Sequence, residues 1–148
     1  MEQNDRHGRN LRRGRVSLPS HVYAITAVTR DRDPVFRDFA SARCLVKVLR
    51  EHEEHGRART WRFVVMPDHL HWLMQLGETH PLGTVVRDVK ALSSRRLGQR
   101  LWQKGFYDHA VREDEALREL ARYIIANPVR AGLVEKTGDY PHWDAVWL

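Results

Sequence analysis

Cysteine is nearly absent from this chain of 148 residues, where only Cys44 occurs. A single thiol cannot form a disulfide within the chain, so the cysteine content gives no indication of secretion. Long hydrophobic runs are missing as well, because no apolar stretch approaches the roughly 20 residues of a membrane-spanning helix. The N-terminal residues also lack the hydrophobic core of a secretion signal. We therefore expect a cytoplasmic protein.

Acidic residues are too few to balance the basic ones. The chain has 19 Asp and Glu against 25 Lys and Arg, which gives a formal net charge of +6. Such an excess favours a polyanionic partner, with nucleic acid first and an anionic membrane surface second, although a basic protein without such a partner remains an alternative. Internal repeats and low-complexity segments are not found. The length and the 42% hydrophobic content fit one folded domain.

Residues 1–15 form a basic arm ahead of this domain, which we place at residues 16–148. The arm contains almost nothing apolar, and its only acidic residues are Glu2 and Asp5. Its cations are Arg6, Arg9, Arg12, Arg13 and Arg15. An arm of this kind can follow nucleic-acid phosphates, and it can equally be a solvated tail.

Two histidines occupy the most apolar segment of the chain, residues 63–76. After Pro67 the residues alternate as in a β-strand, so His69 and His71 should point to the same face, about 6.5–7 Å apart at Cα. Two imidazoles at this spacing can bind one metal ion through nitrogen. The pair can also be solvated or hydrogen-bonded on an exposed strand face, so a metal site needs further ligands from elsewhere.

Hydrophobic periodicity and turn residues predict four strands and three helices. Their order is strand 21–29, helix 38–55, strand 60–66, strand 69–76, helix 81–101, strand 102–112 and helix 114–127. The first six elements predict an α+β protein with the ferredoxin-like split β-α-β arrangement, in which helices cover one face of an antiparallel sheet. The seventh is an extra C-terminal helix. The two histidines should then lie on the face away from the apolar core.

Charged residues on the helices have two interpretations. The helix 81–101 carries a basic flank that includes Lys90, Arg95 and Arg96, and we expect this flank beside the histidine strand, where it can contact phosphates. A basic helix flank is also commonly just solvated surface. Residues 51–55, which include His52 and His55, are expected to be a solvated helix end rather than a metal site.

Tyr123 and Asn127 are four residues apart on the third helix, so they project from one side of it. Pro128 ends the helix there. Taken alone, the tyrosine fits a partly buried helix position and the asparagine fits a helix C-terminus.

Two of these segments resemble one known family. Residues 66–71 and 122–133 look like the two motifs of the REP-associated tyrosine transposases, a branch of the HUH single-tyrosine transposases. Residues 102–109 and 11–15 add to the likeness, which covers most of the chain. The resemblance implies that His69, His71 and Asn127 hold a divalent ion, Mg²⁺ or Mn²⁺. It also implies that Tyr123 is the nucleophile. Some relatives have glutamine in place of Asn127, which gives the amide a longer reach.

The same resemblance implies a substrate and a reaction. Tyr123 would attack single-stranded DNA beside a REP-type hairpin with a flanking tetranucleotide, forming a 5′-phosphotyrosine and a free 3′-OH. We expect no membrane partner, and the chain acts as a monomer or a homodimer. The residues predicted to contact DNA are Arg9, Arg12, Arg13, Arg15, Lys90, Arg95, Arg96, Lys104 and Arg130. His109 and Arg112 are weaker candidates near the site.

Two other functions are compatible with parts of the pattern. One is a domesticated, sequence-specific DNA-hairpin-binding protein that no longer cleaves DNA. The other is a metal-dependent hydrolase built on the histidine pair, which would need a carboxylate-rich site, whereas only Asp68 is adjacent in sequence. We interpret Asp68 as a turn residue.

Overall fold

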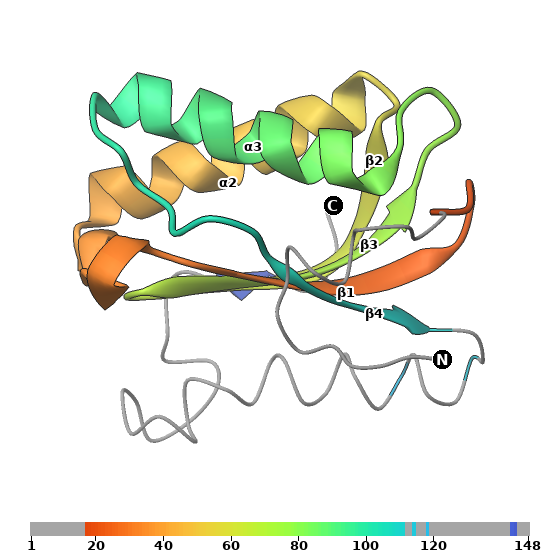
Figure 1. Ribbon diagram of the computed structural model, residues 1–148, viewed down its shortest axis with the longest axis horizontal. Helices are drawn as coiled ribbons and strands as arrows, with labels where there is room; N and C mark the ends of the chain where they lie inside the picture. Colours follow the sequence, from red (N-terminus) through yellow and green to blue (C-terminus); the bar gives the residue numbers. More distant parts are fainter. Residues whose placement is uncertain (1–16, 112–113, 115–117, 119–142, 145–148) are drawn as a thin grey trace.

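The computed structural model describes residues 17–111, 114, 118, 143 and 144. Within them a five-stranded antiparallel sheet has the strand order β4-β1-β3-β2-β5. Two helices, α2 (Phe39–Glu54) and α3 (Leu82–Leu97), lie on one side of this sheet (Figure 1). The strands are β1 (Val22–Val28), β2 (Ala58–Met66), β3 (His69–Leu76), β4 (Tyr107–Val111) and β5 (Trp143–Asp144).

The chain order and the sheet order together confirm the predicted α+β, ferredoxin-like arrangement. Strands β1, β2, β3 and β4 alternate with the two helices as β-α-β-β-α-β, and β1 and β3 are the central strands of these four. The two-residue strand β5 extends the sheet beyond β2, where Trp143 pairs with Val64. Two short 3₁₀ turns, η1 (Arg30–Arg32) and η2 (Val35–Arg37), connect β1 to α2.

The main core fills the space between the sheet and the two helices. Alternate residues of β3, namely Leu70, Trp72 and Met74, point into it because side chains on a strand alternate between faces. The buried indole of Trp72 donates a hydrogen bond to Thr60 Oγ1 at 2.9 Å, which satisfies its polar group inside the core. Packing against this layer makes β3 a rigid support for the residues on its other face.

The helix α3 and the strand β4 are shorter than the sequence predicted. Gly98, with a left-handed φ of 69°, ends α3 at Leu97 rather than near residue 101. Between α3 and β4 the chain makes only an isolated antiparallel bridge, from Trp102 to Thr29, and β4 itself begins at Tyr107, so the predicted strand 102–112 was too long at its start. Leu101 is apolar and buried although it lies after the helix, and this is why the hydrophobic pattern predicted a helix as far as residue 101.

His52 was wrongly predicted to be solvated. Its side chain is only 2% exposed, and its Nδ1–H donates a hydrogen bond to the carbonyl of Val48 at 2.9 Å. The residue continues the buried stripe that Leu45 and Leu49 begin on α2, and burial lowers the pKa of its imidazole. His55, in contrast, is exposed as predicted.

Several predicted features lie outside the described residues. These are the basic arm at residues 1–15, Arg112, and the residues Tyr123, Asn127 and Arg130. Of the predicted third helix, Asp114 and Arg118 are described, and both have helical backbone. Among the described residues, no helix is both long enough and apolar enough to cross a membrane.

Candidate functional site

The β2–β3 hairpin positions the two histidines on the face of the sheet opposite α2 and α3. Pro67 and Asp68 form the turn, and β3 then pairs with both β1 and β2. His69 and His71 alternate with Leu70 and Trp72, which point into the helix-covered core. Because β3 is hydrogen-bonded on both sides, the separation of the Cα atoms of His69 and His71 is fixed by the backbone.

The two imidazole rings converge on one point. Their Nε2 atoms are 3.1 Å apart, and the rings stand almost perpendicular at an interplanar angle of 88°. Two nitrogen lone pairs would repel each other at this distance, so the arrangement is stable with a proton or a metal ion between them. The predicted alternation of β3 thus brings the two rings together, while the ion itself stays a prediction.

Both Nδ1 atoms have partners on the other side of the rings. His69 Nδ1 lies 2.7 Å from Asp68 Oδ1, and His71 Nδ1 lies 3.2 Å from Thr26 Oγ1. A carboxylate can only accept, so the first contact places a proton on His69 Nδ1. A proton on each Nδ1 leaves both Nε2 atoms available as ligands.

Burial keeps His71 neutral. Desolvation, followed by the charge of His69, lowers the pKa of His71 to about 4, so its imidazole has a free lone pair at neutral pH. Burial alone would raise the pKa of Asp68. The hydrogen bond from His69 and the charges of His69 and Arg32 outweigh this effect, so the pKa of Asp68 is lowered and it stays a carboxylate.

The donor atoms fit a divalent ion bound through two nitrogens. Two neighbouring ligands of an octahedral ion at about 2.1 Å are separated by about 3.0 Å, close to the observed separation of the Nε2 atoms. In the described part of the chain, no group of three or more His, Cys, Asp or Glu could hold a metal. The histidine pair therefore needs further ligands, and the predicted one, Asn127, lies outside the described residues.

The basic residues of α3 are not beside the histidines. Residues Val85, Val86 and Val89 pack α3 into the main core, so its cations lie on the opposite side of the sheet from His69 and His71. The expectation that this flank borders the histidine strand was wrong, because one strand face carries the histidines while both helices cover the other. His109 does share the histidine face, since it pairs with Ala24, which pairs in turn with Leu73.

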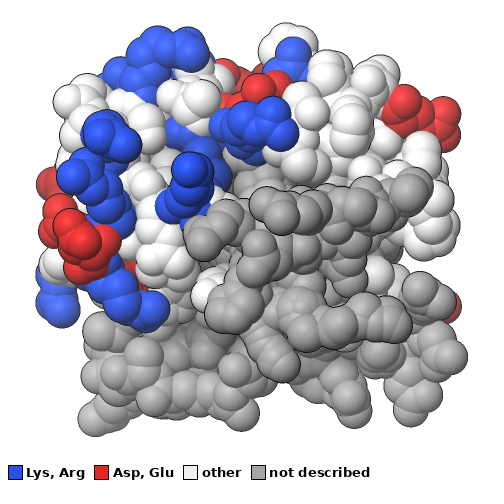
Figure 2. Space-filling model, viewed as in Figure 1, with Lys and Arg blue, Asp and Glu red and all other residues white. Residues whose placement is uncertain are grey.

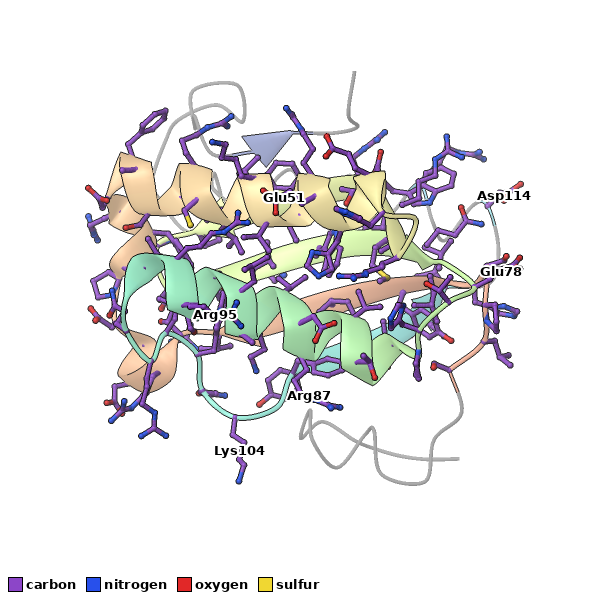
Figure 3. All side chains as sticks on the ribbon, turned by 90° about the horizontal axis from the view of Figure 1, so that it is seen from above. Glu51, Glu78, Arg87, Arg95, Lys104 and Asp114 are labelled. Atoms are coloured by element: carbon purple, nitrogen blue, oxygen red, sulfur yellow. The ribbon has the colours of Figure 1, made fainter. Side chains whose placement is uncertain are left out.

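Two of the predicted DNA contacts on α3 already have partners within the protein. Arg96 forms a two-fold ion pair with Glu51 of α2, with distances of 2.9 and 2.7 Å. Lys90 Nζ donates to the carbonyls of Gln103 and Gly105, which ties the segment after α3 to that helix. Arg95 and Lys104 are exposed, and Figure 3 shows Lys104 extending from that segment.

A groove of about 640 Å³ lies between α3 and residues 99–105. Figure 2 shows Lys and Arg side chains gathered over this part of the surface. The charged residues that line it are Arg87, Lys90, Arg100 and Lys104, and no acidic residue of the described part of the chain lines it. We call this the basic groove.

Burial of Lys90 predicts a pH-dependent contribution to stability. Desolvation lowers the pKa of Lys90 to about 8, from 10.5 in the unfolded chain. Between these values the unfolded state holds more protons than the folded state, so the free energy of unfolding should rise with pH. The melting temperature of the wild type minus that of Lys90→Met should therefore increase as the pH rises from 7.5 to 9.5. Parallel profiles for the two proteins would contradict this prediction.

Thr26 and Arg32 are site residues that sequence reasoning missed. Arg32 Nε lies 3.1 Å from Asp68 Oδ2, and Thr26 pairs directly with His71 across the β1–β3 ladder. Alternation placed Thr26 on one face of its strand, but nothing in a single sequence gives the register between strands so far apart. Asp68, interpreted as a turn residue, also contacts His69.

Comparison with known proteins gives an independent result. The model of a protein family described as "Transposase IS200 like" matches residues 17–127. A Haemophilus influenzae relative whose name places it among the REP-associated tyrosine transposases is 28% identical over 142 residues, covering 82% of this chain and 77% of the relative. The REP-associated tyrosine transposase of Escherichia coli is 32% identical over 99 residues, covering 66% of this chain and 58% of that relative.

The fold has a close counterpart among solved structures. A REP-associated tyrosine transposase bound to a REP hairpin superimposes with a TM-score of 0.78 at 24% identity, covering 87% of this chain and 79% of that one. The resemblance seen in the sequence motifs is therefore confirmed.

Proposed function

Because the chain belongs to the family of IS200-like transposases, we propose that it cuts and rejoins single-stranded DNA at REP-type hairpins. The observation that carries this proposal is the convergence of His69 and His71, whose Nε2 atoms are 3.1 Å apart while each Nδ1 has a partner. Such a pair suits a divalent ion, and the proposed enzyme is a metal-dependent endonuclease and strand transferase.

The proposed reaction is a transesterification at one phosphodiester. The hydroxyl of Tyr123 attacks the phosphorus, loses its proton to solvent and forms a 5′-phosphotyrosine, while the bond to the 3′-oxygen breaks and that oxygen takes up a proton. A divalent ion held by His69 and His71, with Asn127 as a further ligand, would neutralise charge developing on the phosphate oxygens. Attack by a different 3′-OH reverses the step and joins strands without ATP, since the ester linkage is conserved.

The chemistry explains why a metal is needed. A tyrosine hydroxyl has a pKa of about 10, so it is a weak nucleophile at neutral pH. Withdrawal of charge from the phosphate makes the attack easier, and two neutral imidazoles leave the positive charge of the ion undiminished. The amide oxygen of Asn127 is a ligand that suits Mg²⁺ or Mn²⁺.

We further propose that the hairpin stem contacts the basic groove through its phosphates. Arg87, Arg100 and Lys104 line this groove, and none of the described residues that line it with them is acidic, whereas Arg96 is paired with Glu51. Contacts of this kind give affinity rather than sequence specificity, and they weaken with salt. The arm residues Arg9, Arg12, Arg13 and Arg15, with Arg130, are proposed as additional contacts around the foot of the hairpin and the tetranucleotide.

Neutralising the groove should weaken hairpin binding and its dependence on salt. In the triple variant Arg87→Gln/Arg100→Gln/Lys104→Gln, the slope of log affinity against log salt should fall by about 0.9 for every phosphate that is no longer neutralised. The matched control, Arg37→Gln/Arg43→Gln/Lys47→Gln, removes the same charge from exposed positions outside the groove. Fluorescence anisotropy across a salt series measures the hairpin affinity of each variant and the dependence of that affinity on salt. Equal reductions in the two variants would show that net charge, and not the groove, is responsible.

The proposed activity can be tested without knowing the recognised sequence. A pool of labelled single-stranded hairpins with a randomised stem foot and flanking tetranucleotide is incubated with the protein and Mg²⁺ or Mn²⁺. A denaturing gel should reveal a covalent protein–DNA adduct that requires the metal. Binding without cleavage would indicate a DNA-hairpin-binding protein instead, and cleavage without an adduct would indicate a hydrolase.

A further inference from the structure

We propose that Asp68 is a positioning residue of the metal site, which fixes the ring of His69 so that Nε2 faces His71, and that Arg32 assists it by holding the second carboxylate oxygen. The inference rests on the proposed metal site. It assigns to Asp68 a role beyond that of the turn between β2 and β3.

The hydrogen bonds of Asp68 account for both of its carboxylate oxygens. Oδ1 lies 2.7 Å from His69 Nδ1, and Oδ2 lies 3.1 Å from Arg32 Nε. Its backbone carbonyl accepts a hydrogen bond from the N–H of Thr29 at 2.9 Å, which ties the hairpin turn to the end of β1. The carboxylate is therefore held at both oxygens and its backbone is held by Thr29, so a ring bonded to Oδ1 cannot rotate freely.

Arg32 reaches Asp68 from an unusual backbone turn. Asp31 and Arg32 have φ values of 57° and 53°, in the left-handed region that residues with a side chain rarely adopt. The turn is closed by a hydrogen bond from the N–H of Arg32 to the carbonyl of Thr29 at 3.0 Å. Such a conformation persists where the surrounding contacts hold it, and here it directs a guanidinium at the outer oxygen of Asp68.

The two contacts of the carboxylate should differ in strength. The side chain of Arg32 is 63% exposed, whereas those of Asp68 and His69 are 25% and 17% exposed. Solvent screens an exposed ion pair, so the contact with Arg32 should matter much less than the contact between Asp68 and His69. This ranking separates the proposal from a general effect of charge near the site.

The two histidines are also held by different groups. Thr26 offers His71 a neutral hydroxyl at 3.2 Å, whereas Asp68 offers His69 a full negative charge at 2.7 Å. A carboxylate behind an imidazole raises its basicity as a metal ligand as well as fixing its orientation. His69 is thus the ligand whose affinity should depend most on the residue behind it.

Calorimetric titration of the full chain with Mn²⁺, in the absence of DNA, tests the proposal. In Asp68→Ala the Kd for Mn²⁺ should rise by about 10- to 100-fold, the usual effect of losing a group behind a ligating histidine. In Asp68→Asn the rise should be smaller, because the amide can still accept from Nδ1–H. In Arg32→Ala it should stay within about fivefold. Asp33→Ala, an exposed carboxylate in the neighbouring turn, serves as the matched control and should bind Mn²⁺ like the wild type.

A second measurement uses the unaltered protein, in case the Asp68 variants do not fold. The ¹⁵N-coupled proton resonance of His69 Nδ1 should be present and protected from exchange in the wild type. Absence of that proton, or an unchanged Mn²⁺ Kd in folded Asp68→Ala, would overturn the proposal. If the wild type forms a DNA adduct but folded Asp68→Ala binds Mn²⁺ with the same Kd as the wild type, this inference alone fails. If the wild type neither binds Mn²⁺ nor forms an adduct, the proposed function fails.

Discussion

Replacement of Tyr123 by phenylalanine is expected to eliminate the covalent protein–DNA adduct and to leave hairpin affinity almost unchanged. The substitution removes one oxygen atom, the proposed nucleophile, and preserves the ring. Strand cleavage should fall by at least about 10⁴-fold, the scale of loss when other enzymes are deprived of their nucleophile. Adduct formation on a denaturing gel and hairpin binding by anisotropy measure the two properties separately.

The chain offers a matched control for this experiment. Tyr107 on β4 is an exposed tyrosine, and Tyr107→Phe makes the same chemical change at another accessible place. That variant should form the adduct at the rate of the wild type. Persistence of the adduct in Tyr123→Phe would assign the nucleophile to another residue and would remove the basis for the proposed reaction.

Loss of His69 is the second large effect that we expect. In His69→Ala the remaining histidine cannot hold a divalent ion alone, so cleavage should fall by at least about 10³-fold. The side chain points away from the main core, and the fold should tolerate its removal. Hairpin binding should persist, because the basic groove lies on the other side of the sheet. Chelation of the metal by EDTA should reproduce the loss in the wild type, and added Mn²⁺ should reverse it.

His55→Ala is the control for His69→Ala, and it should cleave and bind the hairpin like the wild type. His55 is an exposed histidine at the C-terminal end of α2, on the side of the sheet away from the histidine pair (Figure 1). If His69→Ala reduced hairpin binding and cleavage to the same extent, the metal site and the hairpin contacts would not be separate, contrary to the arrangement proposed above.

The fold was predictable from the sequence because its elements obey simple periodicities. Alternation after Pro67 predicted that His69 and His71 share a face, and the apolar stripes of α2 and α3 predicted a helical layer over the other face. The ferredoxin-like order then followed from the sequence of strands and helices. The predicted element boundaries were wrong where a local feature ended an element, as with Gly98, which ends α3 before the predicted position.

The groups that support the site were not predictable in the same way. Thr26 meets His71 only through the register of β1 against β3, and Arg32 meets Asp68 only through a left-handed turn. Lys90 was predicted to contact DNA, yet its ammonium binds two backbone carbonyls of a segment whose path no periodicity reveals. Tyr123 and Asn127 lie outside the described residues, so their positions remain predictions of the family resemblance.

The polarity of the covalent linkage tests the central claim most directly. A cleavable hairpin oligonucleotide is labelled at its 5′ end in one reaction and at its 3′ end in another, and both are resolved on a denaturing gel with Mn²⁺ present. A 5′-phosphotyrosine requires that the 3′-labelled fragment travel with the protein while the 5′-labelled fragment is released with a free 3′-OH. Retention of the 5′-labelled fragment on the protein, or release of both fragments, would contradict attack by Tyr123 as described.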